Sequence, residues 1–339
     1  MITRTAPLQN DKTGRIGKQD VFLPSAEPGH GDDLHAIIRR YEKNPIITPA
    51  DLPCSANSVF NSGCIKHNNL YIMMLRVENT DGSQHFRMAY SDNGKNFSIE
   101  KDPVNIPPTN EMERFELLCY DPRITRLDDT FYVSYAAHGT KGVRISLIKT
   151  DDFKNFTRIG YISQPDNRNG VLFPQKIKGR YVRLDRPTIA YGQGGKGDMW
   201  LSYSPDLIHW GDSRLVAETR HERWDGHKIG AGPAPILTEY GWLLLYHGVY
   251  ERCNGLVYRC GVMLLDTDEP HKVIFRGNNA VLGPHELYER VGDVPNVVFV
   301  TGAVPEPDGT VSLYYGGADT VMCLAFAKIS DLIDAAMNR

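Results

Sequence analysis

Short apolar stretches alternate with polar turns along most of this chain, and one pattern returns at intervals of about 50 to 70 residues. Each copy has a short strand-like segment, a tight turn rich in Asn, Asp or Gly, and then a second and a third strand. The second strands begin near Tyr71, Phe131, Tyr181, Trp242 and Ser312. The pattern therefore predicts five repeated β-sheet units.

The third strands are expected at 85–91, 143–150, 198–204, 257–266 and 322–328. Three of them end in related turns, 91–97, 150–156 and 204–210, where a hydroxyl residue and an Asp can cap the turn and an aromatic residue can pack back on the sheet. Helical periodicity is confined to two short peripheral segments, 33–40 and 330–337. Radial repeats avoid free sheet edges by closing a ring. We therefore expect an all-β fold, one five-bladed β-propeller over residues 41–339, with residues 1–40 as an N-terminal arm.

The net charge of −3 gives no general attraction to nucleic acid or to anionic lipid. Residues 1–27 contain no apolar run of the signal-peptide kind, and no later stretch approaches the length of a membrane span, so a cytoplasmic protein without membrane or nucleic-acid partners is expected. The six cysteines lack metal-ligand spacing and are interpreted as reduced. The histidines at 221, 227 and 271 also lack such spacing, so no metal is expected.

Polar residues recur at matching points of the repeat. Arg76, Arg186 and His247 each lie five residues after the aromatic residue that opens a second strand, so they should emerge at the same end of their units. A second polar set accompanies the first strands, at 61–62, 120–123, 168–169 and 228–232. Taken singly, each is readily explained as a solvated strand end. Their recurrence instead indicates one shared mouth of a central channel.

Asp121 is the carboxylate with the most informative setting. Tyr120 precedes it, and Pro122 and an apolar strand follow it. A carboxyl group partly withdrawn from water at the channel mouth can act as a general acid. The alternative is a turn-capping Asp before proline.

Four cationic or potentially cationic residues gather at the same predicted mouth: Arg168, Arg186, Lys228 and His247. They could simply pair with the many acidic residues of the chain. They could also bind a dianion, because guanidinium groups match phosphate oxygens and lysine supplies a point charge. A phosphorolytic enzyme needs no second carboxylate to activate water, since phosphate is itself the nucleophile. One acid beside a basic cluster therefore favours phosphorolysis.

Several motifs together resemble glycoside hydrolase family 130, the mannoside phosphorylases and related mannosidases, over roughly residues 40–332. The motifs are Tyr-Asp-Pro-Arg (120–123), Arg-Asn-Gly-Val-Leu-Phe-Pro-Gln-Lys-Ile (168–177), Ser-Pro-Asp-Leu-Ile-His-Trp-Gly (204–211), Lys-Ile-Gly-Ala-Gly-Pro (228–233), Leu-Tyr-His-Gly-Val (245–249), Val-Pro-Asn-Val-Val-Phe (294–299) and Tyr-Gly-Gly-Ala-Asp-Thr (315–320).

The resemblance implies inverting phosphorolysis of a β-mannoside to α-mannose 1-phosphate, with inorganic phosphate as co-substrate and no cofactor. Asp121 matches the acid, which is thought to protonate the glycosidic oxygen through the 3-hydroxyl of the bound mannose. The positions matching phosphate ligands are Arg168, Asn169, Arg186, Lys228, His247 and Tyr258. Those matching mannose ligands are Asn61, Ser62, Arg76 and Asp319, and Tyr120 lies where the acceptor sugar stacks.

Two other functions stay open: a β-mannoside hydrolase on the same scaffold, and a non-catalytic carbohydrate-binding propeller. Hydrolytic members lose basic phosphate ligands, whereas the cations are intact here. Asp185 beside Arg186 could suggest a hydrolase, but alternation along a strand should point it away from the face that Arg186 uses. The motif at 168–174 is more similar to β-1,4-specific than to β-1,2-specific members, and the family leads us to expect a homo-oligomer.

Overall fold

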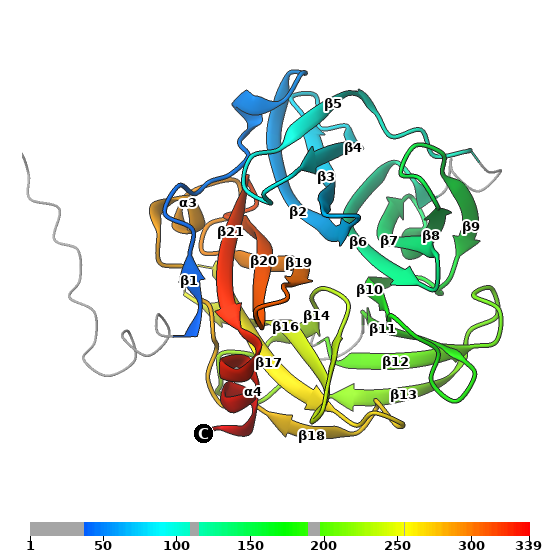
Figure 1. Cartoon of the computed structure of the whole chain (residues 1–339), viewed down its shortest axis with the longest axis vertical. Coiled ribbons are helices and arrows are strands. Elements are labelled where there is room, and N and C mark those ends of the chain that lie inside the picture. The colour runs from blue at the N-terminus through cyan, green and yellow to red at the C-terminus, as the bar shows by residue number, and fades with distance from the viewer. Residues whose placement is uncertain (1–36, 109–114, 189–196, 254) are drawn as a thin grey trace, which may run out of the picture.

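Five antiparallel sheets stand around a common centre and form a five-bladed β-propeller, as the repeat pattern predicts (Figure 1). The computed structural model describes residues 37–108, 115–188, 197–253 and 255–339. Each sheet also has an outer strand that the pattern of three strands did not include.

The first three blades follow the chain in order. Blade 1 contains β2 (Ala56–His67), β3 (Leu70–Asn79), β4 (Gln84–Ser91) and β5 (Ser98–Pro103). Blade 2 contains β6 (Leu118–Leu127), β7 (Thr130–Gly139), β8 (Gly142–Thr150) and β9 (Thr157–Tyr161). Blade 3 contains β10 (Asn167–Leu172), β11 (Tyr181–Pro187), β12 (Met199–Ser204) and β13 (Gly211–Ala217).

The last two blades carry the irregular features. Blade 4 contains β14 (Lys228–Ala231), β15 (Ile236–Thr238), β16 (Gly241–Arg252), β17 (Gly255–Leu265) and β18 (Val273–Arg276). Blade 5 contains β19 (Val298–Pro305), β20 (Thr310–Gly317), β21 (Val321–Lys328) and, from the other end of the chain, β1 (Arg39–Arg40). The short helices are η1 (Pro49–Asp51), α3 (Leu287–Arg290) and α4 (Ile329–Met337), and α4 confirms the helix expected near the C-terminus.

The ring is closed by pairing the N-terminal strand β1 with β21 (Figure 1). Arg40 Nε lies 2.7 Å from Glu289 Oε1, and the Tyr315 hydroxyl donates to the same oxygen at 2.8 Å. The expected boundary at residue 40 therefore falls too late, because Arg39 and Arg40 belong to blade 5. The helix expected over 33–40 does not reach its predicted end, because residues 39 and 40 form a strand. Residues 1–36 lie outside the described residues.

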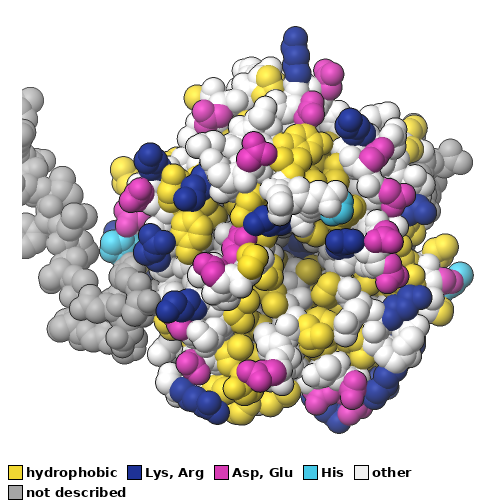
Figure 2. All heavy atoms as spheres, in the orientation of Figure 1, with side chains coloured by type: hydrophobic (Ala, Val, Ile, Leu, Met, Phe, Trp, Pro, Cys, Tyr) yellow, Lys and Arg dark blue, Asp and Glu magenta, His cyan; other side chains and the backbone are white. Residues whose placement is uncertain are grey.

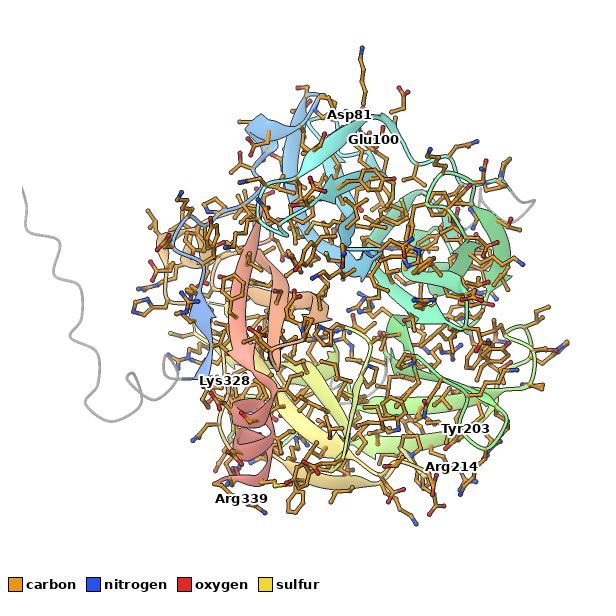
Figure 3. All side chains as sticks on the ribbon, in the orientation of Figure 1. Asp81, Glu100, Tyr203, Arg214, Lys328 and Arg339 are labelled. Atoms are coloured by element: carbon orange, nitrogen blue, oxygen red, sulfur yellow. The ribbon has the colours of Figure 1, made fainter. Side chains whose placement is uncertain are left out.

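Apolar side chains are buried between neighbouring blades, so the core is divided into five clusters around the ring. The alternation along each strand produces this division, because both faces of every blade meet another blade. The three related turns are capped as expected, except that Asn93, rather than Asp92, accepts from the backbone N–H groups of the first one. Polar residues of outer strands, such as Glu100 and Arg214, lie at the rim (Figure 3).

All six cysteines are among the described residues and are free thiols, as expected. No helix in the described part of the chain is long and apolar enough to cross a lipid bilayer.

Candidate active site

Three β-bulges turn polar side chains out of the innermost strands of blades 1, 2 and 3. The strand register shifts at equivalent points: between Phe60 and Gly63, between Tyr120 and Arg123, and between Arg168 and Val171. One residue at each bulge has a positive φ: 46° at Asn61, 54° at Asp121 and 57° at Asn169. Asn and Asp tolerate this left-handed backbone better than most residues. The bulges therefore re-aim three side chains that a regular ladder would place elsewhere.

Asp121 is buried and is held by donors from blade 1. Its Oδ1 accepts a hydrogen bond from Arg76 Nη1 at 2.7 Å and another from Asn61 Nδ2 at 3.1 Å. The guanidinium of Arg76 is itself packed over the rings of Phe60 and Tyr120, with its carbon 4.0 and 4.9 Å from their centroids. The predicted acid and three residues predicted to contact sugar are thus brought together.

Arg123 was not singled out as a site residue, although it ends the Tyr-Asp-Pro-Arg motif. Its side chain is 1% exposed, and burial lowers the pKa of its guanidinium to about 10. Nη1 donates to the backbone carbonyl of Asp121 at 2.9 Å, while Nε donates to the carbonyl of Gly232 at 2.8 Å. Arg123 therefore ties the bulge that carries the acid to blade 4.

The basic residues of blades 3 and 4 meet at His247. Arg186 Nη1 lies 3.1 Å from His247 Nε2, and Asn169 Nδ2 lies 3.3 Å from the same nitrogen. Burial, and then the nearby charges of Arg186, Arg123 and Lys228, hold the pKa of His247 well below its usual value. A neutral imidazole that accepts at Nε2 carries its proton on Nδ1.

Lys228 adds another cation to this cluster, with Nζ 5.3 Å from the ring centroid of Tyr258. Burial, followed by the charges of Arg186 and Arg168, lowers the pKa of Lys228 to about 8. Burial and the charge of Arg168 also lower the pKa of Arg186 to about 10. Positive charges are thus held close together, an arrangement that a bound anion would relieve.

Glycines in two of the motifs leave room for these side chains. A Cβ atom on Gly230 would lie 2.4 Å from Asn169 Nδ2 and 2.5 Å from His247 Cε1. A Cβ atom on Gly316 would lie 2.2 Å from Asn61 Oδ1. Both glycines are required by close approach rather than by backbone conformation.

Four buried polar atoms of the site have no hydrogen-bond partner among the described residues: Asn61 Oδ1, Arg76 Nε, Arg168 Nε and His247 Nδ1. Buried polar groups are nearly always satisfied in native proteins. Their concentration at one place indicates a binding site for a ligand with both hydroxyl and anionic oxygens.

The other predicted ligands differ in how they are placed. Burial raises the pKa of Asp319 to about 7, and this carboxyl interacts electrostatically with both Arg76 and Asp121. Burial also raises the pKa of Tyr258 and of Tyr120. Ser62 is completely buried, and its hydroxyl donates to the Phe60 carbonyl and accepts from the backbone N–H of Arg76. Ser62 therefore shapes the bulge, and its contact with mannose stays a prediction.

Asp185 points away from Arg186, as strand alternation predicts. Its Oδ2 accepts from Arg183 Nη2 at 2.6 Å in the space between blades 2 and 3, whereas Arg186 contacts His247 at the centre.

Figure 2 shows a hollow near the centre of the propeller face, bordered by Lys and Arg side chains. Among the described residues, no group of three or more His, Cys, Asp or Glu side chains is arranged to hold a metal ion.

Comparison with known proteins places this geometry in a family. A family model described as beta-1,4-mannooligosaccharide phosphorylase, glycoside hydrolase family 130, matches residues 36–338. The chain is 39% identical over 311 residues to the β-1,4-mannooligosaccharide phosphorylase of Ruminococcus albus, covering 89% of this chain and 91% of that protein. It is 32% identical to the β-1,2-mannobiose phosphorylase of Listeria innocua, covering 87% of this chain and 97% of that protein.

A solved structure of the β-1,2-mannobiose phosphorylase of Listeria innocua in complex with β-1,2-mannobiose superimposes with a TM-score of 0.82 at 30% identity, covering 89% of this chain and 99% of that one. The family match spans all five blades and every residue of the site described above. The chain therefore belongs to glycoside hydrolase family 130.

Proposed function

We propose that this protein is a β-mannoside phosphorylase, a glycosyltransferase that acts with inorganic phosphate and inverts the anomeric carbon. The observation that carries the proposal is the division of the site: the carboxylate of Asp121 is held by Arg76 and Asn61 at one end, and a cluster of cations meets at His247 at the other. Membership of family 130 supports the same reaction.

Phosphate binds at the basic end of the site. Arg168 and Arg186 offer guanidinium forks, Lys228 offers a point charge, and Asn169 and Tyr258 offer neutral donors. Because Arg186 donates to Nε2 of His247, the ring proton lies on Nδ1. This N–H has no acceptor among the described residues and can donate to a phosphate oxygen. This set of largely buried donors can recognise a dianion.

The acid works from the sugar end. Both hydrogen bonds to Asp121 end on Oδ1, so Oδ2 is the oxygen that exchanges a proton with a substrate hydroxyl. A phosphate oxygen attacks the anomeric carbon as the glycosidic bond breaks, and the leaving oxygen takes a proton that Asp121 supplies through the 3-hydroxyl of mannose. Asp121 is left as a carboxylate, which Arg76 and Asn61 stabilise.

The transferred mannose contacts Asn61, Arg76 and Asp319, with Ser62 behind them, and Tyr120 stacks on the acceptor sugar. We propose the β-1,4 linkage, because the β-1,4-mannooligosaccharide phosphorylase is 39% identical, whereas the β-1,2-specific relatives are 32 or 33% identical and a 4-O-β-D-mannosyl-D-glucose phosphorylase is 28% identical. The reaction requires no cofactor or metal. A cytoplasmic location and a homo-oligomeric assembly stay predictions.

The raised pKa of Asp319 favours hydrolysis as a second candidate function. A carboxyl group with a pKa of about 7 in the same site could serve as the base that activates water. The neighbouring cations favour phosphate binding at this site, because a hydrolase would have no bound anion to balance their charges. A non-catalytic carbohydrate-binding propeller would need neither the acid nor the cations.

The deciding experiment measures consumption of β-1,4-mannobiose and β-1,2-mannobiose with and without inorganic phosphate. The proposal predicts turnover that depends on phosphate, with a higher kcat/KM for the β-1,4 linkage. Release of free mannose at the same rate without phosphate would establish hydrolysis instead, and binding without turnover would establish the carbohydrate-binding module.

A further inference from the structure

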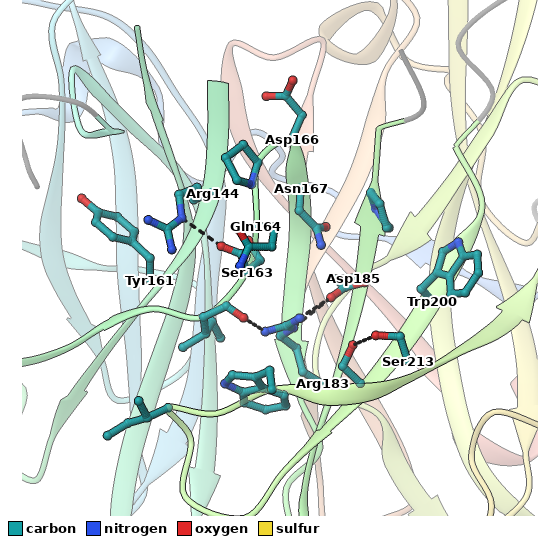
Figure 4. Close-up of a pocket in the computed structure, with 16 residues that line it drawn as sticks. Arg144, Tyr161, Ser163, Gln164, Asp166, Asn167, Arg183, Asp185, Trp200 and Ser213 are labelled. Atoms are coloured by element: carbon teal, nitrogen blue, oxygen red, sulfur yellow. Dashed lines mark hydrogen bonds and ion pairs between the residues drawn. The ribbon is translucent and has the colours of Figure 1, made fainter. Parts of the chain in front are cut away.

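A cavity of about 300 Å³ lies between blades 2 and 3, outside the site described above (Figure 4). The buried apolar cluster described between blades 2 and 3 contains only six side chains, whereas the one between blades 1 and 2 contains twelve. The six are Leu127, Ile145, Leu147, Ile162, Leu172 and Leu207. The two blades are thus packed by fewer apolar groups than their neighbours, and the remaining space is open. Small-molecule sites begin at about 300 Å³.

Aromatic rings stand at the sides of this cavity. Figure 4 shows Tyr161 and Trp200 at opposite sides, with Asn167, Arg183 and Asp185 between them. Both aromatic side chains are partly exposed. Rings of this kind, separated by polar groups, suit a pyranose, because a sugar ring presents C–H faces to aromatic surfaces and a rim of hydroxyl groups to polar atoms.

The polar floor of the cavity is buried and electrically balanced. Arg183 is 3% exposed, and its Nε and Nη2 donate to Asp185 Oδ2 at 3.0 and 2.6 Å. Both bonds end on Oδ2, so Oδ1 of Asp185 can accept from a ligand hydroxyl. Because the carboxylate neutralises the guanidinium, this floor favours a neutral molecule rich in hydroxyl groups over an ion.

Asn167 gives an independent sign of a ligand. It is 8% exposed, lines the cavity, and its buried Oδ1 has no hydrogen-bond partner within residues 37–108, 115–188, 197–253 and 255–339. Leaving such an acceptor unsatisfied destabilises a protein, whereas a hydroxyl donor from a bound sugar would satisfy it. The orphaned atom is therefore placed as a ligand contact would be.

The cavity shares its strands with the phosphate end of the active site. Asn167 and Asp185 directly precede Arg168 and Arg186, which pair with each other across β10 and β11. Alternation along a strand directs consecutive side chains to opposite faces. The two pockets thus lie back to back on blade 3, and Trp200 pairs with Asp185 on the neighbouring strand β12.

We propose that this cavity is a second carbohydrate site, which binds a pyranose unit of a mannooligosaccharide chain away from the catalytic centre. The identity of the sugar rests on the proposed function, and the existence of the site rests on the cavity itself. Such a site would hold long substrates on the enzyme between turnovers.

The test uses the full chain carrying Asp121→Asn, so that the sugar is not consumed, and titrates it with β-1,4-mannotetraose in a calorimeter. Trp200→Ala in this background is expected to remove one binding event per chain or to weaken it about tenfold or more. Trp200→Phe keeps a ring and should retain it. Tyr240→Ala removes an exposed aromatic residue remote from both sites and should change nothing.

A second variant, Ser213→Tyr, places a large side chain in the cavity from its exposed side. It tests the same site independently if Trp200→Ala fails to fold. It should remove the same binding event, while a chain that retains Asp121 and carries Ser213→Tyr should process mannobiose at the normal rate. Titrations that neither Trp200→Ala nor Ser213→Tyr alters would overturn the second site. Failure of phosphate-dependent turnover in the unmutated chain would instead overturn the proposed function, and it would leave this binding measurement interpretable.

Discussion

Arg186 Nη1 lies 3.1 Å from Nε2 of His247 and fixes that nitrogen as an acceptor. Since arginine stays protonated in proteins, the histidine must carry its single proton on Nδ1, for which the described part of the chain offers no acceptor. An arginine and a histidine that would both be interpreted as cations from the sequence thus form one cation and one neutral donor. This arrangement explains how so many basic residues share a small buried space.

The first prediction follows from that pair. His247→Phe keeps the ring packing against Phe299, whose centroid is 4.5 Å away, but removes the Nδ1 donor. The KM for phosphate should rise about 10- to 100-fold, the range for losing a hydrogen bond to a charged group, while the KM for the mannoside should change less than about threefold. Steady-state kinetics with each substrate varied would check this. His221→Phe, which replaces an exposed histidine, provides the control. Equal increases in the two KM values for His247→Phe would count against a role of His247 in phosphate binding.

The acid is tested by Asp121→Asn. This substitution retains the shape of the side chain but removes the proton donor, so kcat should fall by about 10² or more. Asp129→Asn, at an exposed turn after the same strand, should leave kcat unchanged. A carbohydrate-binding propeller would show no such difference, because sugar affinity would be its only property.

Lys228 should set the alkaline limit of activity. Its pKa is lowered to about 8 by burial and then by Arg186 and Arg168, so the ammonium loses its proton as the pH rises through 8. The kcat/KM for phosphate, which reports the free enzyme, should therefore fall above that pH. In Lys228→Arg the side chain stays charged, and the alkaline limb should move up by at least about one pH unit. If the alkaline fall in kcat/KM occurred at the same pH in Lys228→Arg and in the wild type, it would belong to a group other than Lys228. Lys141→Arg, at an exposed position, serves as the control.

Closure of the ring depends on Arg40 and Glu289. The Glu289 carboxylate is completely buried, and Arg40 donates to both of its oxygens, at 2.7 and 2.9 Å. Arg40→Ala would leave this charge without its cation, so the free energy of unfolding should fall by about 3–5 kcal/mol. The neighbouring Arg39→Ala removes an exposed side chain and should have an effect below about 1 kcal/mol. Urea unfolding of both variants gives the comparison, and similar losses in the two would remove the special role of the buried pair.

The repeats could be predicted because they are local. Alternation and turn residues define the second and third strands, and the spacing from Tyr181 to Arg186 places the arginine at a strand end. The closing strand could not be found this way, because Arg39 pairs with Phe326, far along the chain, and a two-residue strand has no periodicity. The outer strands, such as Ser98–Pro103, are mostly exposed and lack the apolar alternation that marks a strand.

The site was predicted by residue type and only partly by geometry. The sequence places Asp121 at a strand start, but it does not reveal the bulge with a positive φ that turns its carboxylate toward Asn61. Arg123 was missed because a buried arginine that binds backbone carbonyls resembles any other arginine in a motif. Asp185 was interpreted correctly, since strand alternation alone decides its direction.

The most direct test of the account is to identify the first sugar product formed from β-1,4-mannobiose and inorganic phosphate by ³¹P and ¹H NMR. An acid at Asp121 acting opposite a bound phosphate predicts α-mannose 1-phosphate, with the anomeric carbon inverted, and one molecule of free mannose from the acceptor side. Two molecules of free mannose with no sugar phosphate, or a β-configured phosphate, would contradict it.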